Sequence, residues 1–146
     1  NKFLNAMATG DHVWAQGWSE PGAGSDMAAI RTTAVLEDGF FVINGQKTWS
    51  SRAAYADWTF GLFRTDLESE RHHGLSFILA PLDLPGITVR PIPQLDGEPG
   101  FAEIYFDDVK VPAENLIGGE GEGWKIAMAT AAVSYTHLTL PTTPYV

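Results

Sequence analysis

The chain contains no cysteine, and this absence excludes disulfides, a thiolate nucleophile and cysteine-ligated metal sites. Basic residues are also scarce: 9 Lys and Arg stand against 18 Asp and Glu, which gives a formal net charge of −9. A charge of this sign argues against nucleic acid and anionic membranes as partners. The sequence has no apolar run as long as a membrane span and no signal-peptide pattern, so we expect a cytoplasmic protein.

What the chain does contain is enough for one folded domain. Its 146 residues are 45% hydrophobic and 12% aromatic, a composition typical of a globular protein with a core. The 15 Gly and 9 Pro indicate many turns, and therefore short strands rather than long helices.

Several apolar or alternating runs follow one another through the middle of the chain, each bounded by Gly, Pro or charged residues. Asp38 and Gly39, between two such runs, are a strong β-hairpin signal. The strand count and turn spacing predict a mainly β fold, an antiparallel β-barrel or sandwich over residues 13–115. The predicted strands are Ile30 to Glu37, Phe40 to Asn44, Trp58 to Phe63, Leu75 to Leu79, Ile87 to Ile92 and Phe101 to Phe106.

Helical segments are expected only towards the two ends of the chain. Lys2 to Met7 resemble the last turn of a helix that Gly10 stops, and Trp124 to Ala129 the start of another. Ser134 to Val146 carry no charge but include four Thr and two Pro. We therefore expect this last stretch to interrupt the helix and to form a non-native or disordered tail.

Two motifs carry the functional signal. The stretch Trp18 to Asp26 (WSEPGAGSD) is a tight turn, in which Gly22 and Gly24 place no Cβ between the backbone and a ligand. Alone, such a turn is more often structural than ligand-binding. Further along, Ile43 to Ser51 (INGQKTWSS) offers an indole and two hydroxyls, groups that can cover an aromatic ring and hydrogen-bond its edge.

Together, and in this order, the two motifs resemble the flavin-contacting face of the middle β-domain of acyl-CoA dehydrogenases. The likeness extends to Phe106 to Pro112 (FDDVKVP) and Gly121 to Trp124 (GEGW), and Gly97 to Glu103 (GEPGFAE) is similar to a bacterial branch of the family. The resemblance implies four parts: residues 1–12 as the end of an N-terminal helical domain, 13–115 as the middle β-domain, 116–133 as a connector and the start of a C-terminal helical domain, and 134–146 as the tail.

The resemblance also implies a reaction. In this family a carboxylate removes the α-proton of an acyl-CoA thioester while hydride leaves the β-carbon for flavin N5. The implied protein is an FAD-dependent acyl-CoA dehydrogenase acting on a CH–CH bond, homo-oligomeric at full length, with an electron-transfer flavoprotein as electron acceptor. Because the catalytic Glu of the family usually lies in the C-terminal helical domain, no catalytic residue is predicted here, and the fragment alone is expected to be inactive.

By their positions in the motifs, particular residues take on implied roles. Ser19 is expected at the pyrimidine edge of the flavin, Ser51 at N5 or O4, and Trp49 against the ring. Ser25 is expected to face the CoA part of the substrate. The full set of implied FAD-binding residues is Gln16, Trp18, Ser19, Gly24, Trp49, Ser50 and Ser51.

Other polar residues are interpreted as structural. Glu20 is expected to be a satisfied polar group and Asp26 a turn or cap acceptor, rather than a pair of general bases. His72 and His73 lie in a charged connection without convergent ligand spacing, so no metal site is predicted. Lys47 is left with two interpretations, a phosphate contact or a surface lysine.

Two other functions stay open on this evidence. The chain could be a flavin or acyl-CoA binding module without catalysis of its own. It could also belong to an acyl-CoA oxidase or a flavin monooxygenase relative, in which reduced flavin meets O₂.

Overall fold

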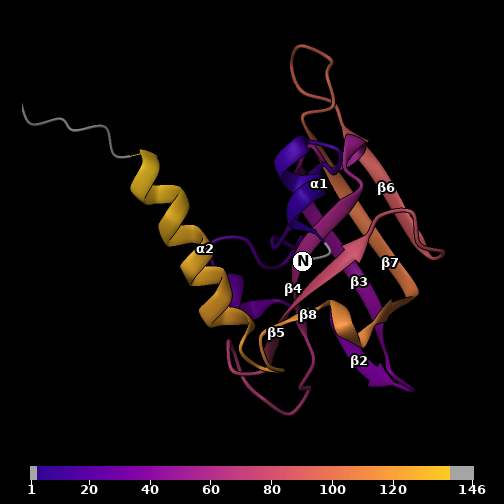
Figure 1. Cartoon of the computed structure of the whole chain (residues 1–146), viewed down its shortest axis with the longest axis vertical. Coiled ribbons are helices and arrows are strands. Elements are labelled where there is room, and N and C mark those ends of the chain that lie inside the picture. The colour runs from indigo at the N-terminus through magenta and orange to yellow at the C-terminus, as the bar shows by residue number, and fades with distance from the viewer. Residues whose placement is uncertain (1–2, 139–146) are drawn as a thin grey trace, which may run out of the picture.

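The computed structural model describes residues 3–138. The strands occupy most of the middle of the chain, with one helix near each end and three short 3₁₀ turns (Figure 1). In chain order the elements are α1 (Leu4–Thr9), β1 (Trp14–Gly17), a 3₁₀ turn (Met27–Ala29), β2 (Thr33–Glu37), β3 (Phe40–Ser51), a 3₁₀ turn (Ala53–Tyr55), β4 (Trp58–Arg64), β5 (Leu75–Pro81), β6 (Ile87–Ile92), β7 (Phe101–Pro112), a 3₁₀ turn (Ala113–Asn115), β8 (Leu116–Ile117) and α2 (Gly123–Leu138).

All eight strands belong to one sheet, in the order β6-β7-β3-β2-β4-β5-β8, with β1 paired to β4. The mainly β fold predicted from the sequence is confirmed. Two details differ from an antiparallel barrel: β1 and β2 each pair with β4 in parallel, and the path of the sheet ends at β6 and β8 instead of closing. The parallel pairings are possible because other strands separate these pairs along the chain: β2 and β3 lie between β1 and β4, and β3 lies between β2 and β4.

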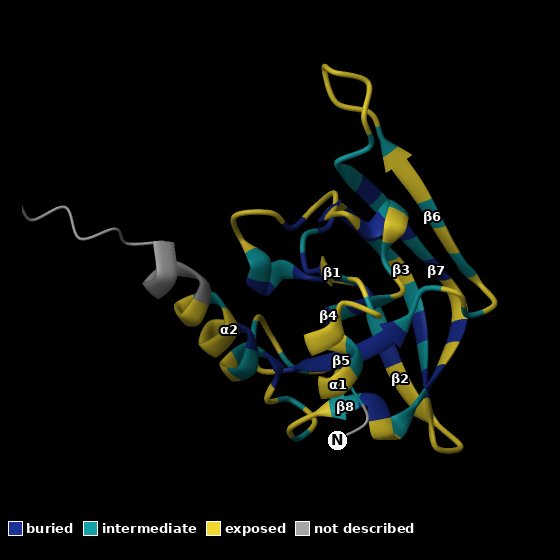
Figure 2. Cartoon of the chain, turned by 45° about the horizontal axis from the view of Figure 1, so that its top comes forward, coloured by how far each residue is buried: buried dark blue, intermediate teal, exposed yellow. Residues whose placement is uncertain are grey.

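The first hydrophobic core lies inside the curl of the sheet. Long strands β3 and β7 supply much of it, because their side chains alternate between the two faces. In β7, Ala102, Ile104 and Phe106 are buried, whereas Glu103 and Tyr105 are half-buried on the other face. Figure 2 shows the buried segments gathered along β3, β5 and β7, with exposed residues on the turns.

A second core lies on the opposite side of β4 and β5. Leu62, Leu75 and Phe77 from these strands pack there with Ile30, and α2 adds Ala127. The helix approaches β5 so closely that a Cβ on Gly123 would lie 2.5 Å from the carbonyl carbon of Ser76. Glycine at the start of α2 therefore permits the helix to sit directly on the strand.

The ends of the chain agree only in part with expectation. Helix α1 ends at Gly10, which has φ +78°, so the predicted stop is confirmed. Helix α2 continues to Leu138, so the expectation that Ser134 to Val146 interrupts the helix is wrong for its first residues. The rest of that predicted tail, residues 139–146, lies outside the described residues. Neither helix of the described part is long and apolar enough to cross a membrane.

Candidate functional site

The first motif forms a closed turn at the end of β1. The amide of Glu20 donates to the carbonyl of Ala23 and the amide of Ala23 donates back to Glu20, both at 3.0 Å. Pro21 and Gly22 form the corner and are exposed, and no atom lies within 4 Å of a Cβ built on Gly22 or on Gly24. The turn therefore presents open backbone to solvent, as the sequence predicted.

The second motif lies on β3, at an irregularity in its pairing with β7. The register shifts between Lys47 and Ser50, which is the signature of a β-bulge. Trp49, inside the bulge, has φ +57°, an uncommon conformation for a bulky side chain. Its indole is 61% exposed and meets Phe101 edge-on, with ring centroids 6.0 Å apart. The bulge thus turns Trp49 outward and leaves Ser50 buried and Ser51 exposed.

The structure brings the two motifs into direct contact. The amide of Thr48 donates to the carbonyl of Ser19 at 2.9 Å. One residue earlier, the Lys47 ammonium donates to a Glu20 carboxylate oxygen at 2.8 Å and to the Trp18 carbonyl at 3.4 Å. These three hydrogen bonds join the turn and the bulge into one continuous surface.

The Lys47–Glu20 pair is fully enclosed, and this corrects the expectation for Lys47. The Lys47 side chain has no exposed surface, and its ammonium also donates to the Leu62 carbonyl at 2.6 Å. Glu20 accepts from the amides of Arg31 at 2.7 Å and Thr32 at 3.0 Å, so the prediction that it is a satisfied polar group is confirmed. Lys47 is neither a surface lysine nor free to meet a phosphate.

Burial and charge act on this pair in opposite directions. Burial lowers the pKa of Lys47 from 10.5 to about 8, although the Glu20 carboxylate works to raise it. Burial also works to raise the pKa of Glu20, but the Lys47 charge and the hydrogen bonds from Lys47, Thr32 and Arg31 outweigh it and hold that pKa below its usual 4.5. Both groups are therefore charged at neutral pH.

Several polar groups of the two motifs have no partner within the described part of the chain. The hydroxyls of Ser19, Ser25 and Ser51 make no hydrogen bond there, and the buried Ser50 hydroxyl and the Trp18 indole N–H are also unsatisfied. Buried polar groups in proteins almost always find a partner. Of the four unsatisfied buried polar atoms among residues 3–138, two belong to the motifs, and the other two, His12 Nδ1 and Trp14 Nε1, lie outside them.

Two hollows border this surface. One, of about 570 Å³, is lined by Trp49 and Phe101 together with Ile92 to Asp96. The other, of about 370 Å³, lies between the turn and β3, beside Pro21, Gly22 and Gln46. Of the other predicted residues, Gln16 is exposed on β1 and Gly24 is exposed on the turn. Neither touches the bulge through a hydrogen bond among residues 3–138.

Arginines gather on the far side of the turn. Arg31, Arg64 and Arg71 line a hollow of about 330 Å³. Arg64 is held by backbone carbonyls, including that of Ile30 at 2.9 Å, so its role is structural. The Asp26 side chain pairs with Arg71 at 3.0 Å and caps no helix; its backbone carbonyl accepts a turn hydrogen bond instead. Of the two roles expected for Asp26, turn acceptor or cap acceptor, the backbone carbonyl fills the first, and the side chain does not fill the second.

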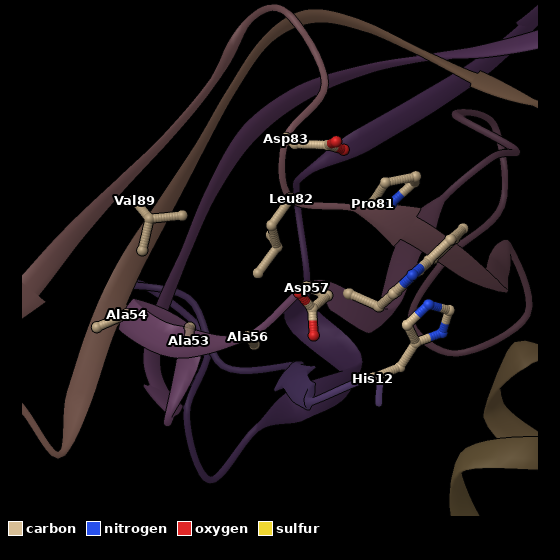
Figure 3. Close-up of a pocket in the computed structure, with 10 residues that line it drawn as sticks. His12, Ala53, Ala54, Ala56, Asp57, Pro81, Leu82, Asp83 and Val89 are labelled. Atoms are coloured by element: carbon tan, nitrogen blue, oxygen red, sulfur yellow. The ribbon is translucent and has the colours of Figure 1, made fainter. Parts of the chain in front are cut away.

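A separate hollow lies away from both motifs. Figure 3 shows His12, Asp57 and Asp83 around a space of about 560 Å³, with Leu82 and Val89 on its walls. None of the predicted site residues lines it. It therefore adds nothing to the surface formed by the turn and the bulge.

The histidine pair does not form a metal site. His72 lies 5.4 Å from Trp124, measured between ring centroids, and 4.1 Å from His73. Among residues 3–138 there is no group of three or more His, Asp or Glu side chains that could hold a metal ion.

Comparison with known proteins gives a consistent picture. Residues 15–109 match the family described as acyl-CoA dehydrogenase, middle domain. Acyl-CoA dehydrogenase IpdE1 of Mycobacterium tuberculosis is 49% identical over 129 residues, which are 88% of this chain and 34% of that protein. Cyclohexane-1-carbonyl-CoA dehydrogenase of Geobacter metallireducens is 46% identical over 112 residues, or 75% of this chain and 29% of that protein. The chain thus spans about a third of the length of these curated relatives.

Solved structures share the fold. Acyl-CoA dehydrogenase from Geobacillus kaustophilus matches with a TM-score of 0.83 and 38% identity, over 88% of this chain and 34% of that chain. The ChsE4-ChsE5 complex from Mycobacterium tuberculosis matches with a TM-score of 0.82 and 38% identity, over 89% of this chain and 33% of that chain.

Proposed function

Because this chain belongs to the acyl-CoA dehydrogenase family, as its middle domain, we propose that it forms the FAD-binding and acyl-CoA-binding face of an FAD-dependent acyl-CoA dehydrogenase. The observation that carries the proposal is the joined surface of the two motifs. The Thr48–Ser19 hydrogen bond fixes the exposed indole of Trp49 relative to the turn, and hydroxyls without partners lie in both motifs.

The residues present fit a flavin chemically. Serine hydroxyls can both donate to and accept from the polar edge of an isoalloxazine, and an exposed indole can cover part of its apolar surface. In this proposal Ser19 and Ser51 hold the polar groups of FAD, Trp49 packs on the ring, and the buried Ser50 lies beneath them as part of the FAD-binding set. Gln16, Trp18 and Gly24 complete the FAD-binding set. Bound FAD would supply the two-electron acceptor of the reaction, which no side chain of this sequence can supply.

The chain's own contribution is binding and orientation. Donors placed where charge develops are most effective when the protein holds them before reaction, and the strand β3 holds Ser51 in that manner. On the substrate side, Ser25 is exposed in the turn next to Asp26, which pairs with Arg71 at the rim of the arginine-lined hollow; Glu70 also lines this hollow. Guanidinium groups there suit the phosphates of coenzyme A. The electron acceptor in this proposal is an electron-transfer flavoprotein, and the assembled enzyme is a homo-oligomer.

The proposal can be tested in a chimeric enzyme. Residues 13–115 of this chain would replace the matching segment of the Geobacillus kaustophilus acyl-CoA dehydrogenase, so that the host supplies the remaining domains. Trp49→Ala is expected to weaken FAD binding about tenfold, which corresponds to 1.4 kcal/mol. Ser51→Ala should keep more FAD but slow its reduction by roughly ten- to a hundredfold. Ser25→Ala should raise the apparent substrate constant more than it changes FAD binding.

A matched control comes from Tyr55, which is 62% exposed and lies in a 3₁₀ turn outside the two motifs. Tyr55→Ala removes an exposed aromatic ring of similar size and should leave FAD binding unchanged. Reoxidation of the reduced chimera by O₂, with product bound, separates a dehydrogenase from an oxidase or monooxygenase. If all three site variants bind and reduce FAD like the unsubstituted chimera, the proposed site is wrong.

A further inference from the structure

The Lys47–Glu20 pair connects the two motifs to each other, to β4 and to the segment just before β2. Through the ammonium, β3 is tied to the end of β1 at Trp18 and to β4 at Leu62. Through the carboxylate, the turn is tied to the amides of Arg31 and Thr32, just before β2. The pair lies one residue from the Thr48–Ser19 hydrogen bond that joins the two motifs.

A buried ion pair is weak evidence of stabilisation, because apolar residues of similar volume are often as stable in its place. Its better attested effect is to fix one arrangement among several, since a charge without its partner would be left buried. Here the arrangement that the pair fixes is the position of the turn relative to the bulge.

We propose that Lys47 and Glu20 are positioning residues for the flavin, which set the register between the turn and the bulge without touching the cofactor. The pair acts through Ser19, Thr48 and Trp49, whose backbones it holds at a fixed spacing. This inference rests on the proposed flavin site, but its effect on the protein surface can be measured without flavin.

The proposal predicts a pH dependence of flavin binding. In the described part of the chain, Glu20 is the titratable group that contacts the Lys47 ammonium; its other neighbours are the Trp18 and Leu62 carbonyls and the ring of Phe63, 5.1 Å from the ammonium. We take the form with both groups charged as the form that binds FAD. At pH 9, one unit above the Lys47 pKa of about 8, about nine-tenths of the molecules carry a neutral Lys47 and therefore do not bind. The apparent affinity for FAD should therefore fall about tenfold between pH 7 and pH 9.

Global stability should respond in the opposite sense. The pKa of Lys47 is lower in the folded chain than its usual 10.5, so above pH 8 the folded state binds fewer protons than the unfolded state. Through Lys47, stability then rises with pH between about 8 and 10.5. A loss of FAD affinity without a loss of stability therefore distinguishes positioning from a merely structural role.

The experiment uses the 146-residue chain for NMR and the chimeric enzyme, in which the host supplies the remaining domains, for the binding of FAD as the probe. Chemical shifts of the Ser19 and Thr48 amides and the Trp49 indole are followed by NMR from pH 6.5 to 9.5, and FAD affinity is measured by flavin fluorescence over the same range. We expect the three signals to titrate together with a midpoint near the Lys47 pKa, and FAD affinity to fall with the same midpoint. In the double variant Glu20→Gln/Lys47→Met both pH dependences should disappear. Lys110→Met, which changes an exposed lysine of β7, should leave both in place.

The outcomes separate the two proposals. If FAD does not bind at any pH while the three signals titrate with Lys47, the pair positions this surface and the surface is not a flavin site. If FAD binds with the same affinity from pH 7 to pH 9, or if the double variant keeps the parent's pH dependence, the positioning role is overturned.

Discussion

Replacing Lys47 by methionine gives the most direct test of how the buried site is held together. Methionine keeps much of the length and apolar volume of the lysine stem but removes the ammonium, which donates three hydrogen bonds. The Glu20 carboxylate then stays buried, with only 7% of its side chain exposed and no counter-charge at 2.8 Å. Removing one partner of a buried ion pair typically costs about 3–5 kcal/mol. Deprotonation of Lys47 differs from this substitution, because a neutral amine can still donate to Glu20, whereas methionine leaves the carboxylate and the Trp18 and Leu62 carbonyls without that donor.

This cost is large relative to the whole stability of a domain, which is typically about 5–15 kcal/mol. The assay is urea unfolding at pH 7, followed by tryptophan fluorescence and circular dichroism. We expect Lys47→Met to lower the urea midpoint by about 1.5–2.5 M, which is a loss of about 3–5 kcal/mol at a typical slope of about 2 kcal/mol per molar urea. The double variant Glu20→Gln/Lys47→Met should recover part of the loss and cost about 1–3 kcal/mol. The remaining cost arises because glutamine replaces one of the two carboxylate oxygens, which accept from the Arg31 and Thr32 amides, by an NH₂ group that cannot accept.

The control is Lys110→Met, at an exposed position of β7, which should change stability by less than about 0.5 kcal/mol. If Lys47→Met costs less than about 1 kcal/mol, or if the double variant is less stable than the single one, the reasoning about an uncompensated buried carboxylate is refuted.

Two further substitutions test the same region. Gly45→Ala should destabilise the chain by about 3 kcal/mol, because Gly45 has φ +140° and an added Cβ would lie 2.8 Å from the Thr32 Cα. Gly22→Ala is the control and should be nearly neutral, because its Cβ meets no atom within 4 Å. Equal urea midpoints for the two variants would contradict this prediction. Glu20 has a pKa held below 4.5, so the stability that it contributes is fully present above pH 4.5 and is lost as the pH falls through its folded pKa. The Glu20→Gln variant should therefore lose less stability than the parent between pH 6 and pH 3. Parallel losses of the two proteins in urea unfolding would argue against this prediction.

The sequence by itself determined the class of the fold and the place of most strands. Local alternation and turn residues are sufficient for this, because each strand's pattern depends only on its own residues. Ile87–Ile92 has the predicted bounds, and the predicted strands that begin at Phe40 and Phe101 have the right start. Those two strands end later than predicted because each continues through polar residues that pair with the other strand. The two motifs were also identified from the sequence, since their residue types suit one ligand.

The burial of Lys47 was missed, although the sequence contained a signal for it. Phe41 and Ile43 face the core, and continuing their alternation places position 47 on the same inward face. A lysine there requires a buried partner, and Glu20 is such a partner in the turn that precedes β2. The residues around Lys47 or Glu20 do not predict which partner each will have, because 27 positions separate the two and only the folded sheet brings them together.

The orientation of Trp49 was decided by the tertiary structure alone. Strict alternation from Phe41 and Ile43 would turn position 49 inward, as a core tryptophan. The bulge opposite β7 shifts the alternation, so that Ser50 is buried and Trp49 is exposed beside Phe101. A bulge depends on how two strands distant in sequence are paired, and a one-residue shift in that pairing exchanges the two faces of a strand. The sequence therefore provides the indole and the hydroxyls, and the pairing of β3 with β7 determines which of them are exposed.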